Sequence, residues 1–181
     1  GVVWYGGNRR DSNDASFQKN LGLAEAGVRS YLADGGNLLL AYRDVVGDGG
    51  GFSADFAADV LGIEEYFRDE TGTTNIRLAS RSLVGTSLVS APDDTLQTTS
   101  SSPDADFFRL ADDVDPLFWV EPGVLGPNVT PDQTAQRAYL GVLSERDGGR
   151  IALVTYLLSR SDGRNNAHAV GAALLRRVFG I

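Results

Sequence analysis

The sequence predicts a three-layer α/β fold, with a mostly parallel sheet, helices on both faces and a late antiparallel hairpin. Apolar runs short enough to be strands alternate with segments that have helical periodicity, and the runs are 2–5, 38–42, 137–143 and 151–158. The last two runs are joined by a turn with Gly148 and Gly149, which is typical of an antiparallel hairpin. A helix from about Asn166 to Phe179 closes the chain.

The segment Ala15–Asp34 has the periodicity of an amphipathic helix. Its apolar residues recur every three or four positions, at Phe17, Leu21, Ala24, Val28, Tyr31 and Leu32. Asp14 or Ser16 can cap its start, and Gly35 and Gly36 can end it. The runs on either side are apolar without alternation, which predicts strands covered on both faces. Two such strands joined by a helix form a right-handed parallel crossover.

The middle of the chain is less regular. A short helix from Ser53 to Leu61 is expected to end at Gly62. Weak strands are expected near 75–78 and 117–120, and the polar stretch 95–106 is expected to be an exposed surface loop. We therefore predict a single domain over residues 1–181, with an irregular insertion at about 64–126.

Composition excludes several classes of protein. The 181 residues carry a formal net charge of −8, which disfavours binding to nucleic acids and to anionic membranes. No apolar run approaches the roughly 20 residues needed to span a bilayer. The sequence contains no cysteine, so it has no disulfide, no thiolate ligand and no cysteine nucleophile. We expect no cofactor.

The order of these elements resembles the class I glutamine-amidotransferase-like superfamily. The nearest likeness is its non-amidotransferase branch, which includes trehalose-utilisation-like domains and modules of bacterial extracellular proteins. The residues that carry the resemblance are 2–7, 32–40, Arg43, Asp44, 58–63 and 174–181. The resemblance covers about 1–65 and 137–181, and it implies a flavodoxin-like arrangement of the sheet. It also implies a bacterial protein that is secreted or at the cell surface.

Two departures from that superfamily bear on function. Active amidotransferases carry a cysteine on a tight turn after the strand that corresponds to Leu38–Tyr42 and a His-x-Glu near the end, and both are missing. Glutamine amidotransferase activity is thereby excluded. Such folds also have a strand–helix–strand before the segment that corresponds to Val2–Tyr5. We therefore expect this chain to be part of a longer protein, with a companion segment or protein chain completing the N-terminal side of the sheet.

Candidate ligand-binding residues follow the predicted parallel strands. They are Asn8, Arg9, Arg10, Arg43, Asp44, Ser159, Arg160 and Asp162. Ligands of open α/β sheets bind beyond the carboxyl ends of the strands, where arginines beside a carboxylate could hold a carboxylated or polyhydroxylated molecule. The alternative is that Arg43 and Asp44 form a structural ion pair that braces the loops.

The sequence offers two further candidate sites. His168, the only histidine, could act as a general base with Asp44 or Asp162, although a surface histidine at the start of a helix is the simpler interpretation. Asp104, Asp106, Asp112 and Asp113 form a weak candidate calcium site, with solvated loop carboxylates as the alternative. No other metal site is expected.

Two hypotheses about function follow from the sequence. The first is a non-catalytic binding or assembly module of a larger bacterial protein. The second is a small-molecule enzyme, carbohydrate-related, with Asp44, His168 and the arginines lining a cleft at the carboxyl ends of the parallel strands.

Overall fold

The structure is a computed structural model that describes ten stretches of the chain, which are residues 1–5, 15–42, 45–46, 51–67, 79–82, 95–97, 106–120, 138–146, 148–155 and 164–181. The strands are β1 (Val2–Tyr5), β2 (Asn37–Ala41), β3 (Ile63–Phe67), β4 (Ala79–Ser82), β5 (Thr95–Gln97), β6 (Phe107–Leu110), β7 (Asp115–Val120), β8 (Ala138–Ser144) and β9 (Arg150–Val154). The helices are α1 (Ala15–Ala33), α2 (Ala54–Phe56), the π-helical turn η1 (Ala57–Leu61) and α4 (Arg164–Phe179). No described helix is both long and apolar enough to cross a bilayer.

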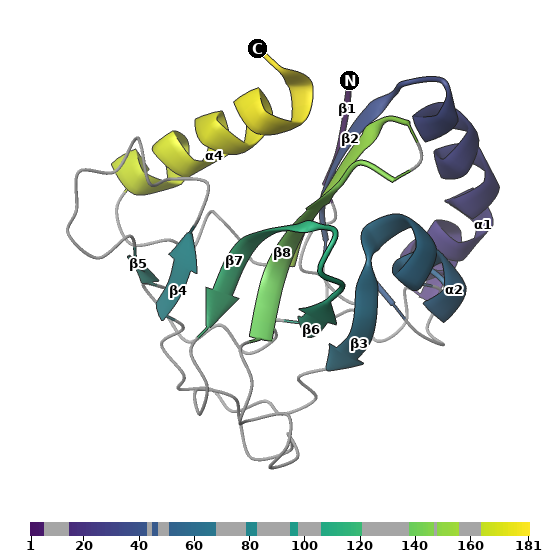
Figure 1. The fold of residues 1–181 in the computed structure, drawn as a ribbon, viewed down its shortest axis with the longest axis horizontal. Helices are drawn as coiled ribbons and strands as arrows, with labels where there is room; N and C mark the ends of the chain where they lie inside the picture. Colours follow the sequence, from purple (N-terminus) through teal and green to yellow (C-terminus); the bar gives the residue numbers. More distant parts are fainter. Residues whose placement is uncertain are drawn as a thin grey trace.

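The described strands form one open sheet in the order β1-β2-β9-β8-β7-β4-β5, with β3 and β6 as a branch beside β8 (Figure 1). Pairing is parallel between β1, β2 and β9 and antiparallel elsewhere. Most strands still point the same way, because only β8, β4 and β3 run against β1. The predicted fold class is confirmed, and so is its late hairpin, which is β8–β9.

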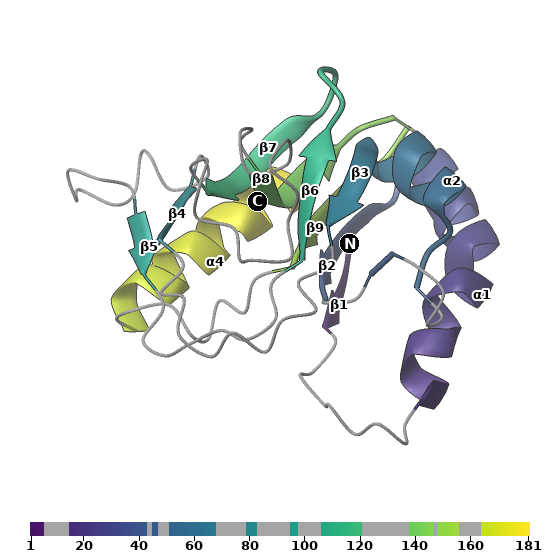
Figure 2. The same ribbon diagram turned by 90° about the horizontal axis from the view of Figure 1, so that it is seen from below.

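The helices cover the two faces of the sheet, and β2 contributes buried side chains to both faces. Leu38 and Leu40 belong to the buried cluster that contains residues of α1, α2 and η1. Leu39 belongs to the other cluster, which contains residues of α4. All three leucines are buried, which explains why this strand is apolar without alternation. We call the two sides of the sheet the α1 face and the α4 face (Figure 2).

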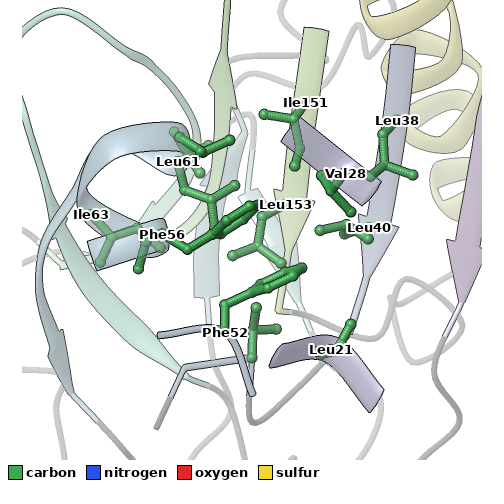
Figure 3. Close-up of a cluster of buried hydrophobic side chains, with 14 of the residues drawn as sticks. Leu21, Val28, Leu38, Leu40, Phe52, Phe56, Leu61, Ile63, Ile151 and Leu153 are labelled. Atoms are coloured by element: carbon green, nitrogen blue, oxygen red, sulfur yellow. The ribbon is translucent and has the colours of Figure 1, made fainter. Parts of the chain in front are cut away.

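Side-chain contacts tie α1 to the short helices on the α1 face (Figure 3). The rings of Phe52 and Phe56 are stacked with centroids 4.2 Å apart, and both side chains are fully buried. The Arg29 guanidinium lies 5.2 Å from the centre of the Phe56 ring and pairs with Asp59 at 3.2 Å. Ser53 caps α2 by accepting a hydrogen bond from the Phe56 amide. These contacts confirm the predicted helix at Ser53–Leu61, which ends at Gly62 with φ of 69°.

The prediction for β1 was wrong in one respect, because this strand is not covered on both faces. Val2 is 46% exposed, Val3 55% and Tyr5 59%, and only Trp4 packs against the α1-face cluster. The physical reason is position, because among the described strands β1 ends the sheet and pairs only with β2. An apolar run therefore indicates a strand, but it does not show whether the strand is buried.

The middle of the chain is more regular than the sequence predicted. It supplies β3 to β7, which all pair antiparallel, most of them with strands that are not their neighbours in sequence. The expected surface loop 95–106 contains β5 and ends in buried Asp106, so that expectation was wrong at both ends. The strand expected at 117–120 is confirmed by β7, whereas 75–78 lies outside the described residues.

Candidate functional site

The carboxyl ends of the three parallel strands lie side by side at one edge of the sheet. The register aligns Tyr5 of β1 with Ala41 of β2, and Ala41 with Val154 of β9. The backbone N–H of Tyr42 donates to the carbonyl of Val154 at 3.1 Å, which extends the pairing past the end of β2. Open α/β sheets bind ligands at this edge, so we call it the strand-end edge.

The sequence-predicted ligand residues follow these strands. Asn8, Arg9, Arg10, Arg43, Asp44, Ser159, Arg160 and Asp162 all lie outside the described residues. The structure does describe the strands that lead to them, and those strands end next to one another as predicted. His168 lies in the first half of α4, and its side chain is not described. These assignments remain predictions.

Two buried polar residues, Asp106 and Thr155, lie next to each other at the strand-end edge. Asp106, 3% exposed, precedes β6 just where β9 ends, and Thr155 follows β9 with 1% exposure. The Thr155 hydroxyl lies 2.7 Å from the carbonyl oxygen of Asp106 and 3.0 Å from that of Leu140. The Thr155 N–H also donates to the Leu140 carbonyl at 2.9 Å.

This junction is where the sheet divides. Strand β8 pairs with β9 along 141–144 and with β6 at Tyr139, so β6 takes over the edge of β8 where β9 ends. Thr155 links the ends of β9 and β6 to β8 at that point, and we call this group of Thr155, Asp106 and Leu140 the fork. The sequence offered no signal for it, because the fork depends on antiparallel pairing between distant segments.

The candidate calcium residues are spread along β6. Asp106 is buried before the strand begins, whereas Asp112 and Asp113 are exposed after it ends. Asp104 lies outside the described residues. In the ranges that the structure covers, no three His, Cys, Asp or Glu side chains gather in a way that could hold a metal ion.

Asp113 has a different role, as the partner of Arg146. Arg146 donates to both carboxylate oxygens of Asp113 and also to the carbonyl of Ala58 in η1. Arg146 therefore ties the β8–β9 turn to the β6–β7 turn and to η1. The hydrogen bond from Arg146 holds the pKa of the Asp113 carboxyl below its ordinary value.

A second candidate surface is the free edge of β1, with the end of α4 beside it. Val3 aligns with Leu39, a residue of the α4-face cluster, so Val3 and Tyr5 project on the α4 face. Gly1 lies so close to the ring of Phe179 in α4 that a Cβ at this position would overlap the ring. Ile181, just beyond α4, is 79% exposed. We call Val2, Val3 and Tyr5 the apolar edge.

Comparison with known proteins supports the fold alone. No family model matches the chain. No curated protein matches it either. Among solved structures it is similar to Gan42B, a GH42 β-galactosidase, with a TM-score of 0.54, 10% identity, and coverage of 88% of this chain and 20% of that one.

Two other solved structures have lower scores. A β-galactosidase from Rahnella sp. R3 has a TM-score of 0.47 and 14% identity over 84% of this chain and 20% of that one. A cytoplasmic protein of Salmonella typhimurium has a TM-score of 0.46 and 11% identity over 86% of this chain and 60% of that one. The chain thus spans about a fifth of the length of the β-galactosidases.

The fork yields a prediction about stability. Thr155→Val keeps the side-chain shape but removes the hydroxyl, so the buried Asp106 carbonyl loses this donor. We expect the free energy of unfolding to fall by about 1–3 kcal/mol, measured by urea denaturation. Thr155→Ser, which keeps the hydroxyl, should lose less. A valine variant as stable as the parent would contradict the assignment.

Asp113 yields a prediction about pH. Because its pKa is lowered in the folded state, the stabilisation by Arg146 is present above the ordinary carboxyl pKa of about 3.9 and is lost as pH falls through the lowered value. Asp113→Asn should therefore lower the Tm more at pH 7 than in strong acid, where the carboxyl becomes protonated. The matched control is Asp112→Asn. A Tm difference that persists unchanged in acid would contradict the assignment.

Proposed function

We propose that this chain is a non-catalytic, amidotransferase-like assembly module of a larger bacterial protein, and that its β1 edge pairs with a strand of a companion segment or chain. The observation that carries the proposal is the apolar edge, whose residues are 46–59% exposed. The absence of cysteine is consistent with the proposal, since the chain cannot supply the cysteine nucleophile of an amidotransferase.

The other free edges of the described sheet are protected, and β1 is not. Natural proteins protect the edge strands of their sheets with charged residues, short strands or β-bulges, because an unprotected edge can pair with other chains. Edge strand β3 carries Glu64 and Glu65, and its pairing with β6 has a register shift. Edge strand β5 has only three residues. Strand β1 has no charged residue, no proline and an unbroken register with β2.

Exposure on both faces explains why pairing is favourable. Val2 projects on the α1 face and Val3 and Tyr5 on the α4 face, so a neighbouring strand would cover apolar surface on each side. That strand would also satisfy the backbone groups of β1 that face away from β2. Main-chain hydrogen bonds and apolar burial together are the basis of recognition by strand addition.

Hydrogen exchange in the full-length protein tests this proposal. The β1 amides that face away from β2 should exchange slowly, because the companion strand accepts their hydrogen bonds. Val3→Lys places a charge in the edge and should make these amides exchange fast, whereas Leu23→Lys on exposed α1 surface should not. Fast exchange in the unmodified protein would contradict the proposal.

A small-molecule enzyme, carbohydrate-related, with its cleft at the strand-end edge, is the second candidate. The buried Asp106 favours it, because active sites are places where ionisable groups are buried. In this hypothesis Asp44 and His168 supply the acid–base chemistry.

Titration with galactose, followed by tryptophan fluorescence, separates the two candidates. The assembly module predicts no saturable change. A saturable change that disappears in Asp44→Ala and persists in Asp34→Ala, an exposed aspartate at the end of α1, would favour the enzyme.

A further inference from the structure

We infer that Arg146 acts as a clamp that closes the π-helical turn η1 and the β6–β7 turn as one cooperative unit, which can open without unfolding of the central sheet. Arg146 lies in the turn between β8 and β9, and its guanidinium contacts both of the other turns. The inference concerns a conformational device in the fold, and it does not depend on the proposed function.

The first contact of the clamp is with the end of η1. Arg146 Nη1 donates to the carbonyl of Ala58 and lies 3.4 Å from the carbonyl oxygen of Asp59. The last carbonyls of a helix have no partner within the helix, and arginine side chains can supply the missing donors. A π-helical turn is a rare conformation that needs such support. Arg146 therefore stabilises the end of η1 from outside the helix.

The second contact of the clamp fixes the orientation of the guanidinium. Arg146 Nε donates to one carboxylate oxygen of Asp113 at 3.0 Å, and Nη2 donates to the other. Two parallel hydrogen bonds hold a guanidinium in a defined plane, which a single contact would not impose. The Arg146 side chain is 25% exposed, so solvent ions screen these contacts only in part. Asp113 therefore holds Nη1 in place for the carbonyls of η1.

Gly62 joins the two turns beneath the guanidinium. Its N–H donates to the carbonyl of Ala57 and closes η1, and its own carbonyl accepts from the Ala111 N–H of the β6–β7 turn at 2.9 Å. A Cβ on Gly62 would lie 3.3 Å from Arg146 Cζ and 2.6 Å from a methyl carbon of Val114, so both side chains pack directly against Gly62. Opening of either turn therefore disturbs the hydrogen bonds of the other, and we expect the two turns to open together.

The clamp lies at the end of the sheet opposite the strand-end edge. It stands between the end of β8 and the start of β9, whereas the strand-end edge lies at the end of β9. The Tyr42 amide donates to the carbonyl of Val154 at that edge, so its protection from hydrogen exchange reports on the central sheet. A local opening at the clamp would appear as lower protection of the Gly62 and Ala111 amides than of the Tyr42 amide.

Amide hydrogen exchange in the full-length protein tests the inference. Arg146→Met keeps a long side chain and removes all of its hydrogen-bond donors. We expect the Gly62 and Ala111 amides to exchange roughly tenfold faster in this variant, and both by the same factor, because one opening exposes them both.

The matched control is Arg150→Met. Arg150 likewise donates to a carboxylate, that of Glu145, and to a carbonyl near the end of a helix, that of Arg177 in α4. These contacts are not part of the clamp, so this variant should leave the exchange of the Gly62 and Ala111 amides unchanged.

A second variant covers the case in which Arg146→Met does not fold. Asp113→Asn keeps the guanidinium but weakens the contact that orients it, so both amides should exchange faster by a smaller common factor. Unequal changes of the two amides, or no change in either, would overturn the inference. Protection of these amides as high as that of Tyr42 in the unmodified protein would overturn it as well.

Discussion

The pairing of β2 with β9 is the interaction on which the rest of the structure depends. Both strands are buried on both faces, so each contributes side chains to the α1-face cluster and to the α4-face cluster. Their parallel register also places their carboxyl ends side by side. One pairing therefore joins the two halves of the core and creates the strand-end edge. The helices are held by this central pair, and β1 is added to its outer side.

The same pairing explains why the two candidate surfaces differ. The strand-end edge is braced from within, by the buried hydroxyl of Thr155 at the fork. Among the described strands only β2 pairs with β1, and Val2, Val3 and Tyr5 remain exposed. Buried polar groups with satisfied hydrogen bonds are compatible with a structural role at the fork. An uncharged edge of regular backbone is instead suited to recognition of another strand.

The sequence predicted the elements whose signal is local. Helix α1 followed from the spacing of Leu21, Val28 and Leu32, and all three are buried as expected. The crossover of β1, α1 and β2 followed from two apolar runs, and the β8–β9 hairpin followed from its glycines. The late helix α4 begins two residues earlier than expected and ends at the expected residue.

The sequence did not predict features that depend on contacts between distant segments. Strands β3 to β6 are short and carry charged or polar residues, so their pairing is set by the tertiary structure rather than by pattern. The sequence around Asp106 suggests no more than a candidate calcium ligand, because nothing local indicates that it is buried beside Thr155. The Arg146–Asp113 pair joins two turns that are 33 residues apart, and no motif indicates it.

The central claim is that β1 is an inner strand of a larger sheet in the assembled protein. An experimental structure of the full-length protein tests it most directly. We predict a further backbone strand about 4.8 Å from β1 on the side away from β2, covering Val3 and Tyr5. A structure in which that side of β1 faces solvent, with Val2, Val3 and Tyr5 as exposed as they are in the isolated chain, would contradict the claim.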